Sequence, residues 1–120
     1  MRAILIVSHG SHSPKTKLEI EALVDALIKR KLVDVIEFAF LEIEKPSIPK
    51  GIESLAKKSA RNIKILLNFL NSGRHVNVDI PKIVNNAKKK HPHIQFSISP
   101  PVGQHPKIVD LFCDLVVKNP

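Results

Sequence analysis

RAILIV, at residues 2–7, is a near-continuous apolar run, and such a run is typical of a strand that is buried on both faces of a sheet. Three further segments of strand length follow at residues 33–41, 62–70 and 93–99. The last of them, HIQFSIS, alternates apolar and polar side chains, which favours an edge strand with one buried face. The sequence therefore predicts a sheet of four strands.

Each predicted strand is followed by a segment whose apolar residues repeat with helical spacing. These predicted helices cover residues 14–31, 48–60, 80–90 and 106–118. A proline stands in the first turn of each, where the amide has no intrahelical partner to lose: Pro14, Pro49, Pro81 and Pro106. Three residues occupy positions expected for N-caps, namely Ser13, Ser47 and Asp79.

The alternation of strands and helices predicts one α/β domain over residues 1–120, a small flavodoxin-like three-layer sandwich around a four-stranded parallel sheet. In such a strand order the first and third strands flank the point at which the order reverses. Four strands make a narrow sheet with exposed edges, and this favours pairing with a second copy of the chain.

The charge balance bears on the kind of partner. Lysine and arginine outnumber aspartate and glutamate by 19 to 11, so the net charge is +8, and a basic surface attracts nucleic acid or a small polycarboxylate. The run Lys88–Lys90 is interpreted as a solvated helix end, where cations suit the helix dipole. The chain has no tryptophan or tyrosine on which bases could stack, so nucleic-acid binding is the less favoured alternative.

Composition excludes several other classes of protein. Hydrophobic residues make up 43% of the chain and charged residues 25%, which is ordinary for a folded domain and excludes wholesale disorder. The apolar runs are far shorter than the ~18–20 residues that span a bilayer, and the first run is too short for a signal peptide. The single cysteine, Cys113, cannot form an internal disulfide, so we expect a cytoplasmic location. It lies on the apolar side of the last predicted helix, where we expect it to be buried.

Residues with metal-binding and acid–base chemistry collect after the predicted strands. His9, His12, His75 and His105 lie in three of the four loops at the carboxyl ends of the strands, and Glu42 lies in the remaining loop. Ligands of open α/β sheets bind at this edge, near the first and third strands. His9 and His75 follow those two strands, so we expect their imidazoles to face each other. They could hold Co²⁺, Ni²⁺ or Fe²⁺, or accept a proton near neutral pH.

The glycines and the serine of these loops leave other interpretations open. Gly10 and Gly73 are small enough to let the backbone approach a flat ligand closely. The His-Gly-Ser segment could instead be an anion-binding turn, although it lacks the repeated glycines of phosphate-binding loops. Ser11 is not in a G-x-S-x-G elbow, so a hydrolase nucleophile is disfavoured.

Four motifs resemble those of one family, the short CbiX-type class II tetrapyrrole metal chelatases. They are ILIVSHGS at residues 4–11, FLE with PSIP within residues 40–49, FLNSGRHVNVDIP at residues 69–81 and PVGQHP at residues 101–106. The stretch G-x-H-V-x-x-D-I-P is the most specific of these, and the similarity follows nearly the whole chain in order. His12 departs from the pattern, because many family members have arginine there.

The resemblance implies insertion of a divalent metal ion into sirohydrochlorin or a related tetrapyrrole, without ATP, as in cobalamin or sirohaem biosynthesis. The metal ion is a substrate, and no organic cofactor is implied. The resemblance also implies a homodimer, because the family's short members work as homodimers. From the composition we expect no nucleic-acid or membrane partner. The family's two metal-binding histidines correspond to His9 and His75, and Glu42 matches an acidic position near the cleft.

A free tetrapyrrole of this kind carries several carboxylates. Arg74, next to His75, is placed to pair with one of them, and we expect Gly10, Ser11, His12 and Gly73 to line the same substrate-binding loops. The alternative is a non-catalytic module on the same fold, which would bind the metal or the tetrapyrrole without joining them.

Overall fold

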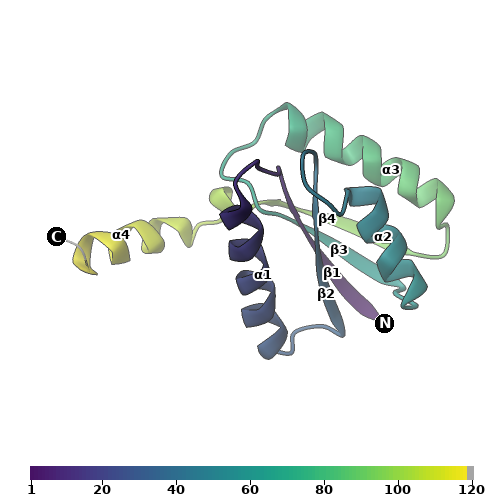
Figure 1. Ribbon diagram of the computed structural model, residues 1–120, viewed down its shortest axis with the longest axis horizontal. Coiled ribbons are helices and arrows are strands. Elements are labelled where there is room, and N and C mark those ends of the chain that lie inside the picture. Colours follow the sequence, from purple (N-terminus) through teal and green to yellow (C-terminus); the bar gives the residue numbers. More distant parts are fainter. Residues whose placement is uncertain (119–120) are drawn as a thin grey trace.

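A computed structural model describes residues 1–118 and contains a single parallel sheet of four strands (Figure 1). The strands are β1 (Arg2–Ser8), β2 (Val35–Phe40), β3 (Asn62–Leu67) and β4 (Gln95–Pro101). Their order is β2-β1-β3-β4, so β4 is an edge strand and the order reverses between β1 and β3. The predicted fold class, the edge strand and the position of the switch point are therefore confirmed.

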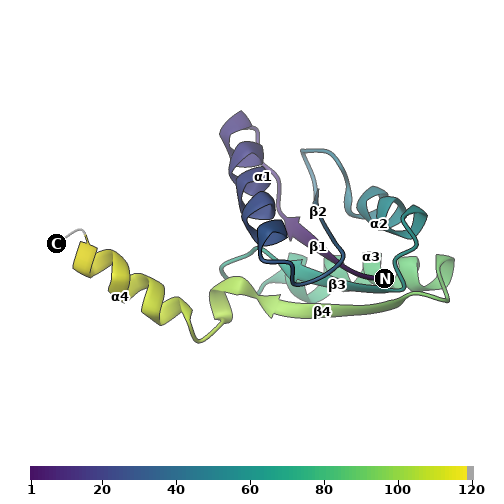
Figure 2. The same cartoon turned by 90° about the horizontal axis from the view of Figure 1, so that it is seen from below.

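Helices cover both faces of this sheet, as Figures 1 and 2 show. Among the residues described, the helices are α1 (Pro14–Lys29), α2 (Ile48–Lys57), α3 (Ile80–Lys90) and α4 (Ile108–Lys118). Two short turns complete the structure, the π-helical turn η1 (His75–Asp79) and the 3₁₀ turn η2 (Val102–Gln104). Across residues 1–118, none of the helices has the length and the apolar character needed to cross a bilayer.

The two sides of β1 contribute to two separate cores, which explains its near-continuous apolar run. Ile4 and Ile6 pack on the α1 side, together with Ile20 and Val24 of α1. The alternate side chains of β1, Ala3, Leu5 and Val7, pack on the α2 and α3 side. A strand that is buried on both faces has no polar side, and so the period-2 alternation disappears.

The helix ends differ from the sequence prediction in several places. Ser47 caps α2, because its Oγ accepts a hydrogen bond from the Lys50 amide at 3.4 Å, but the Ser13 side chain makes no such bond to α1. Asp79 is not an N-cap either, since it has helical φ and ψ at the end of η1 and its carboxylate is used elsewhere. Pro106 lies before α4 rather than in its first turn.

The last helix overturns two expectations about packing. α4 extends away from the sheet and has no buried residue, whereas the sequence predicted that its apolar side would pack on the core (Figures 1 and 2). Cys113 is consequently exposed rather than buried. An apolar stripe shows that a helix face can be buried, but it does not say which surface covers that face.

The lysine run at the end of α3 is exposed in the last helical turn, as predicted. Lys90 Nζ donates a hydrogen bond to Glu53 Oε1 of α2 at 2.9 Å. This bond and the charge of Lys90 lower the pKa of the Glu53 carboxyl. The pair links α2 to α3 on the face opposite α1.

Candidate metal centre

The pairing of β1 with β2 continues past the ends of both strands and brings His9 beside Glu42. The Leu41 amide donates to the Ser8 carbonyl at 2.8 Å, and the Glu42 amide donates to the His9 carbonyl at 3.0 Å. The two side chains meet, with His9 Nε2 at 2.7 Å from Glu42 Oε1. Backbone hydrogen bonds of the extended ladder therefore fix this part of the site.

Gly10 is required by the close contact between these two loops. Its φ is +107°, and an added Cβ would overlap the carbonyl oxygen of Glu42. A side chain at position 10 would thus push the Glu42 loop away from His9. By contrast, nothing lies within 4 Å of the position that a Cβ would take on Gly73.

His75 reaches the same edge of the sheet from the segment after β3. Asn68 Nδ2 donates to the Oγ of the buried Ser8 at 3.0 Å, which ties the end of β3 to the end of β1. The chain then passes through η1, where the Asn77 amide donates to the Gly73 carbonyl at 2.8 Å. π-helical turns are rare and are frequent at functional sites.

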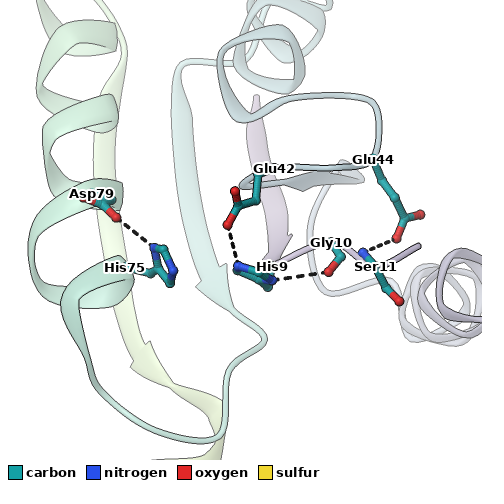
Figure 3. A network of polar contacts seen from close by, with 7 residues as sticks. All are labelled: His9, Gly10, Ser11, Glu42, Glu44, His75 and Asp79. Carbon is teal, nitrogen blue, oxygen red and sulfur yellow. Dashed lines mark hydrogen bonds and ion pairs between the residues drawn. The ribbon is translucent and has the colours of Figure 1, made fainter. Parts of the chain in front are cut away.

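The structure brings His9, Glu42 and His75 together into one cluster. Each residue offers a ligand atom, and these atoms all lie within 4.8 Å of one another (Figure 3). The two imidazole rings are 5.1 Å apart between centroids and tilted by 46°. Two imidazoles and a carboxylate form a donor set suited to first-row divalent ions.

The cluster is open to solvent. The side chains of His9, Glu42 and His75 are exposed to 44%, 53% and 48%. A ligand can therefore approach the three groups without a change in the backbone, and a half-exposed centre of this kind can accept an ion and also release it.

A second set of contacts orients the two imidazoles. His75 Nδ1–H donates to Asp79 Oδ2 at 2.8 Å, which leaves the other ring nitrogen on the side of His9 (Figure 3). His9 Nδ1 lies 3.3 Å from the Gly10 carbonyl oxygen. Carboxylates and carbonyls in these positions hold metal-binding histidines in one orientation and one tautomer.

Sequence reasoning missed this role of Asp79 because it assigned the residue to a helix cap. The signal that could have revealed it is the spacing of four residues between His75 and Asp79, which places two side chains on the same side of a helical turn.

The remaining candidates lie around the cluster rather than in it. The Ser11 amide donates to Glu44 Oε1 at 2.8 Å, so its loop is tied to the Glu42 segment (Figure 3). His12 and Arg74 are exposed. His105 accepts a hydrogen bond from the Lys107 amide at 3.0 Å and is outside the cluster within residues 1–118. Of the four histidines predicted at this edge of the sheet, His9 and His75 converge in the cluster.

We expect replacement of Asp79 by alanine to weaken Co²⁺ binding by about 10–100-fold, because the His75 ring loses the acceptor that orients it. Asp79→Asn should keep most of the affinity, since an amide oxygen can still accept the Nδ1–H bond. Visible absorption during cobalt titration measures both variants, with Asp114→Ala on α4 as the control. An Asp79→Ala protein that binds cobalt like the wild type would show that Asp79 does not position His75.

The CbiX family model matches residues 3–119. A sirohydrochlorin cobaltochelatase of Priestia megaterium is 28% identical over 92% of this chain and 36% of its own length. A sirohydrochlorin cobaltochelatase of Saccharolobus solfataricus is 31% identical over 90% of this chain and 88% of its own length. The chain thus spans well under two thirds of the first of these relatives and most of the second.

A solved chelatase structure is also similar to this chain. The sirohydrochlorin chelatase SirB of Bacillus subtilis subspecies spizizenii, crystallised in complex with cobalt, superposes with a TM-score of 0.88 at 29% identity. The match covers 98% of this chain and 50% of that protein.

Proposed function

Because the chain belongs to the CbiX family, we propose that it is a metal chelatase, which inserts Co²⁺, Fe²⁺ or Ni²⁺ into sirohydrochlorin or a closely related tetrapyrrole without ATP. The observation that supports this most directly is the convergence of His9, Glu42 and His75 at the switch point of the sheet. The proposed place of the reaction is the biosynthesis of cobalamin or sirohaem. The metal ion is a substrate.

The first requirement of the reaction is to hold the ion in the right place with few water molecules. His9 and His75 supply neutral nitrogen ligands from two sides, and Glu42 supplies an anionic oxygen. These ligands replace water on the ion and fix its position relative to a macrocycle that lies over the cluster. The Asp79 and Gly10 contacts keep both imidazoles aimed at this point.

The second requirement is to remove two protons from the pyrrole nitrogens. Two N–H bonds break as the metal–nitrogen bonds form, so two protons must leave for each ion inserted. Once the ion has moved to the macrocycle, the Glu42 carboxylate and an imidazole are free to accept these protons and to pass them to solvent. One set of side chains would therefore serve first as metal ligands and then as bases.

The open position of the cluster suits a large flat substrate. Ile43 and Val78 are next in sequence to Glu42 and Asp79 and are 49% and 50% exposed. Exposed apolar side chains beside the ligands can contact the face of a macrocycle, while its carboxylates extend to the rim. We also assign Gly10, Ser11, His12 and Gly73 to the substrate-binding loops.

We expect Arg74→Gln to raise KM for the tetrapyrrole by about 10-fold with little change in kcat, because a charge-assisted contact to a substrate carboxylate is lost. Arg74 is exposed and adjacent to His75. The matched control is Arg30→Gln at the end of α1, which changes the net charge by the same amount. Equal KM values for the two variants would exclude a direct role for Arg74 in substrate binding.

The experiment that tests the proposed function is an absorbance assay with purified protein, sirohydrochlorin and Co²⁺, Fe²⁺ or Ni²⁺ in turn. Insertion above the spontaneous rate with at least one ion is expected. Binding of metal or tetrapyrrole without any acceleration would identify a non-catalytic module instead. Salt-sensitive binding to DNA or RNA, unaffected by changes at His9 and His75, would identify a polyanion-binding domain.

The proposal includes an assembly and a location. We propose that residues 1–120 form one chelatase domain that works as a homodimer, a state supported by the narrow sheet and by the exposed apolar face of α4. We also propose that it works in the cytoplasm, where a lone exposed thiol such as Cys113 stays reduced.

A further inference from the structure

The backbone at Ile43, next to the candidate ligand Glu42, has a conformation that isoleucine rarely adopts. Its φ is +72°, which lies in the left-handed region. The Glu44 amide donates to the Glu42 carbonyl at 2.8 Å across this residue. A bond between residues i and i+2 around a positive φ is typical of the rarer and more strained form of γ-turn. For a β-branched side chain such a φ is an outlier, and it requires a physical cause.

Two other non-glycine residues within residues 1–118 have a positive φ, and both have an ordinary cause. Lys31 and Ser59, with φ of +54° and +71°, lie just beyond the ends of α1 and α2. The Ser59 amide donates to the Ala56 carbonyl at 3.0 Å, as is usual where a helix ends on a left-handed residue. Ile43 follows no helix, so helix termination does not account for its conformation.

The residues on either side of Ile43 both hold the segment that carries His9. The Glu42 amide donates to the His9 carbonyl at 3.0 Å. On the other side of the turn, Glu44 Oε1 accepts a hydrogen bond from the Ser11 amide at 2.8 Å (Figure 3). These contacts explain why the chain turns sharply at position 43. They do not explain an isoleucine there, because glycine or asparagine would adopt the same conformation with less strain.

Packing within residues 1–118 does not offset this strain. The Ile43 side chain is 49% exposed and belongs to neither of the two apolar cores. Its Cβ lies 3.4 Å from the position that a Cβ on Gly10 would take, so the side chain begins against the segment that follows β1 at the metal centre. Strained residues of this kind cluster at functional sites. The contact that favours isoleucine is therefore sought in a molecule that binds at this edge.

We propose that Ile43 is a specificity-determining residue that contacts the face of the tetrapyrrole, and that the strained turn presents its side chain there. This inference rests on the proposed function and assigns one residue to recognition of the substrate. A macrocycle that lies over the three ligands extends over the residue next to Glu42. A branched apolar side chain suits this contact, because burial of Ile43 against the macrocycle removes apolar area of both from water.

The variant Ile43→Asn separates the side chain from the backbone conformation. Asparagine adopts a left-handed φ readily, so the turn and Glu42 should stay in place while the apolar surface is lost. We expect a melting temperature at or above that of the wild type and an unchanged affinity for Co²⁺. The Kd for metal-free sirohydrochlorin, measured by absorbance titration, should rise by about 10-fold, because the variant loses the partial burial of an isoleucine side chain.

Two further variants serve as controls. Ser59→Asn places the same residue in the same backbone conformation at the opposite edge of the sheet, and it should leave the Kd for sirohydrochlorin unchanged. Ile43→Leu keeps an apolar side chain and should retain most of the affinity. A wild-type Kd for Ile43→Asn would overturn the proposal. An equal loss of Co²⁺ affinity in Ile43→Asn would overturn it as well, because the residue would then act by positioning Glu42.

Separate measurements of binding and insertion distinguish this inference from the proposed activity. If the wild type binds sirohydrochlorin but inserts no metal, the activity is refuted and the Kd of Ile43→Asn still tests the contact. If the wild type inserts metal and Ile43→Asn binds normally, this inference alone is refuted. A wild type that does not bind sirohydrochlorin would overturn both. A changed molar mass of Ile43→Asn in light scattering would place the contact between two copies and refute the inference.

Discussion

Replacing either His9 or His75 by alanine is expected to abolish metal insertion and to weaken Co²⁺ binding by at least about 100-fold. Each imidazole is one of three ligand groups within 4.8 Å of each other, and the loss of one leaves the ion with two protein ligands and additional water. A 100-fold loss of affinity corresponds to about 2.7 kcal/mol of binding free energy, because each ~1.36 kcal/mol changes the affinity tenfold. Insertion of Co²⁺ and a cobalt titration measure the two effects.

The control for these variants is His91→Ala. His91 lies at the end of α3, at the opposite edge of the sheet, where its ring packs against His93 with centroids 6.4 Å apart. Circular dichroism should show native spectra for all three proteins, because His9 and His75 are half exposed. Normal insertion rates in the His9 or His75 variant would mean that the ion is bound elsewhere.

The largest expected effect on stability is that of Gly10→Ala. The backbone there has φ of +107°, which is strained for any residue with a Cβ, and the new Cβ would overlap the Glu42 carbonyl oxygen. The two effects together should lower the free energy of unfolding by about 3 kcal/mol and the melting temperature by roughly 10 °C. Cobalt affinity should fall as well, since the Glu42 loop must move away from His9.

Gly73→Ala provides a matched control for this substitution. It makes the same chemical change in a loop at the same edge of the sheet, but its Cβ would meet no atom within 4 Å. Thermal unfolding should show a native melting temperature for Gly73→Ala. If both variants melted at the wild-type temperature, the loop at Gly10 would be free to relax, and its contact with Glu42 would not fix the site.

Much of the sheet and the centre of the site could be predicted from the sequence. The strand at residues 2–7 is buried on both faces, and its composition shows this directly. For a flavodoxin-like strand order, the rule that ligands bind at the switch point predicts that His9 and His75 face each other. The alternation of strands and helices predicts a parallel sheet, and the flavodoxin-like order that the rule requires is confirmed by the structure.

Details that depend on tertiary contacts were not predictable in the same way. An aspartate before a helix can cap the helix or bond to a nearby side chain, and the sequence does not distinguish the two. The π-helical turn at residues 75–79 brings the Asp79 carboxylate to His75, and this turn has no sequence signature. Gly10 was expected to make room for a ligand, but in the structure it makes room for the Glu42 backbone. The sequence pattern predicts that Cys113 and the apolar side of α4 are buried in a core, but in the structure Cys113 is exposed and α4 has no buried residue.

The origin of the three candidate ligands in separate loops has a thermodynamic consequence. Glu42 follows β2, His9 follows β1 and His75 follows β3, so an unfolded chain cannot present them together. A cation supplied at 100 times its Kd would then favour the native chain by about 2.7 kcal/mol. The bound ion would hold the ends of three strands together. Each transfer of the ion to the tetrapyrrole would remove this stabilisation and return the protein to its less rigid form.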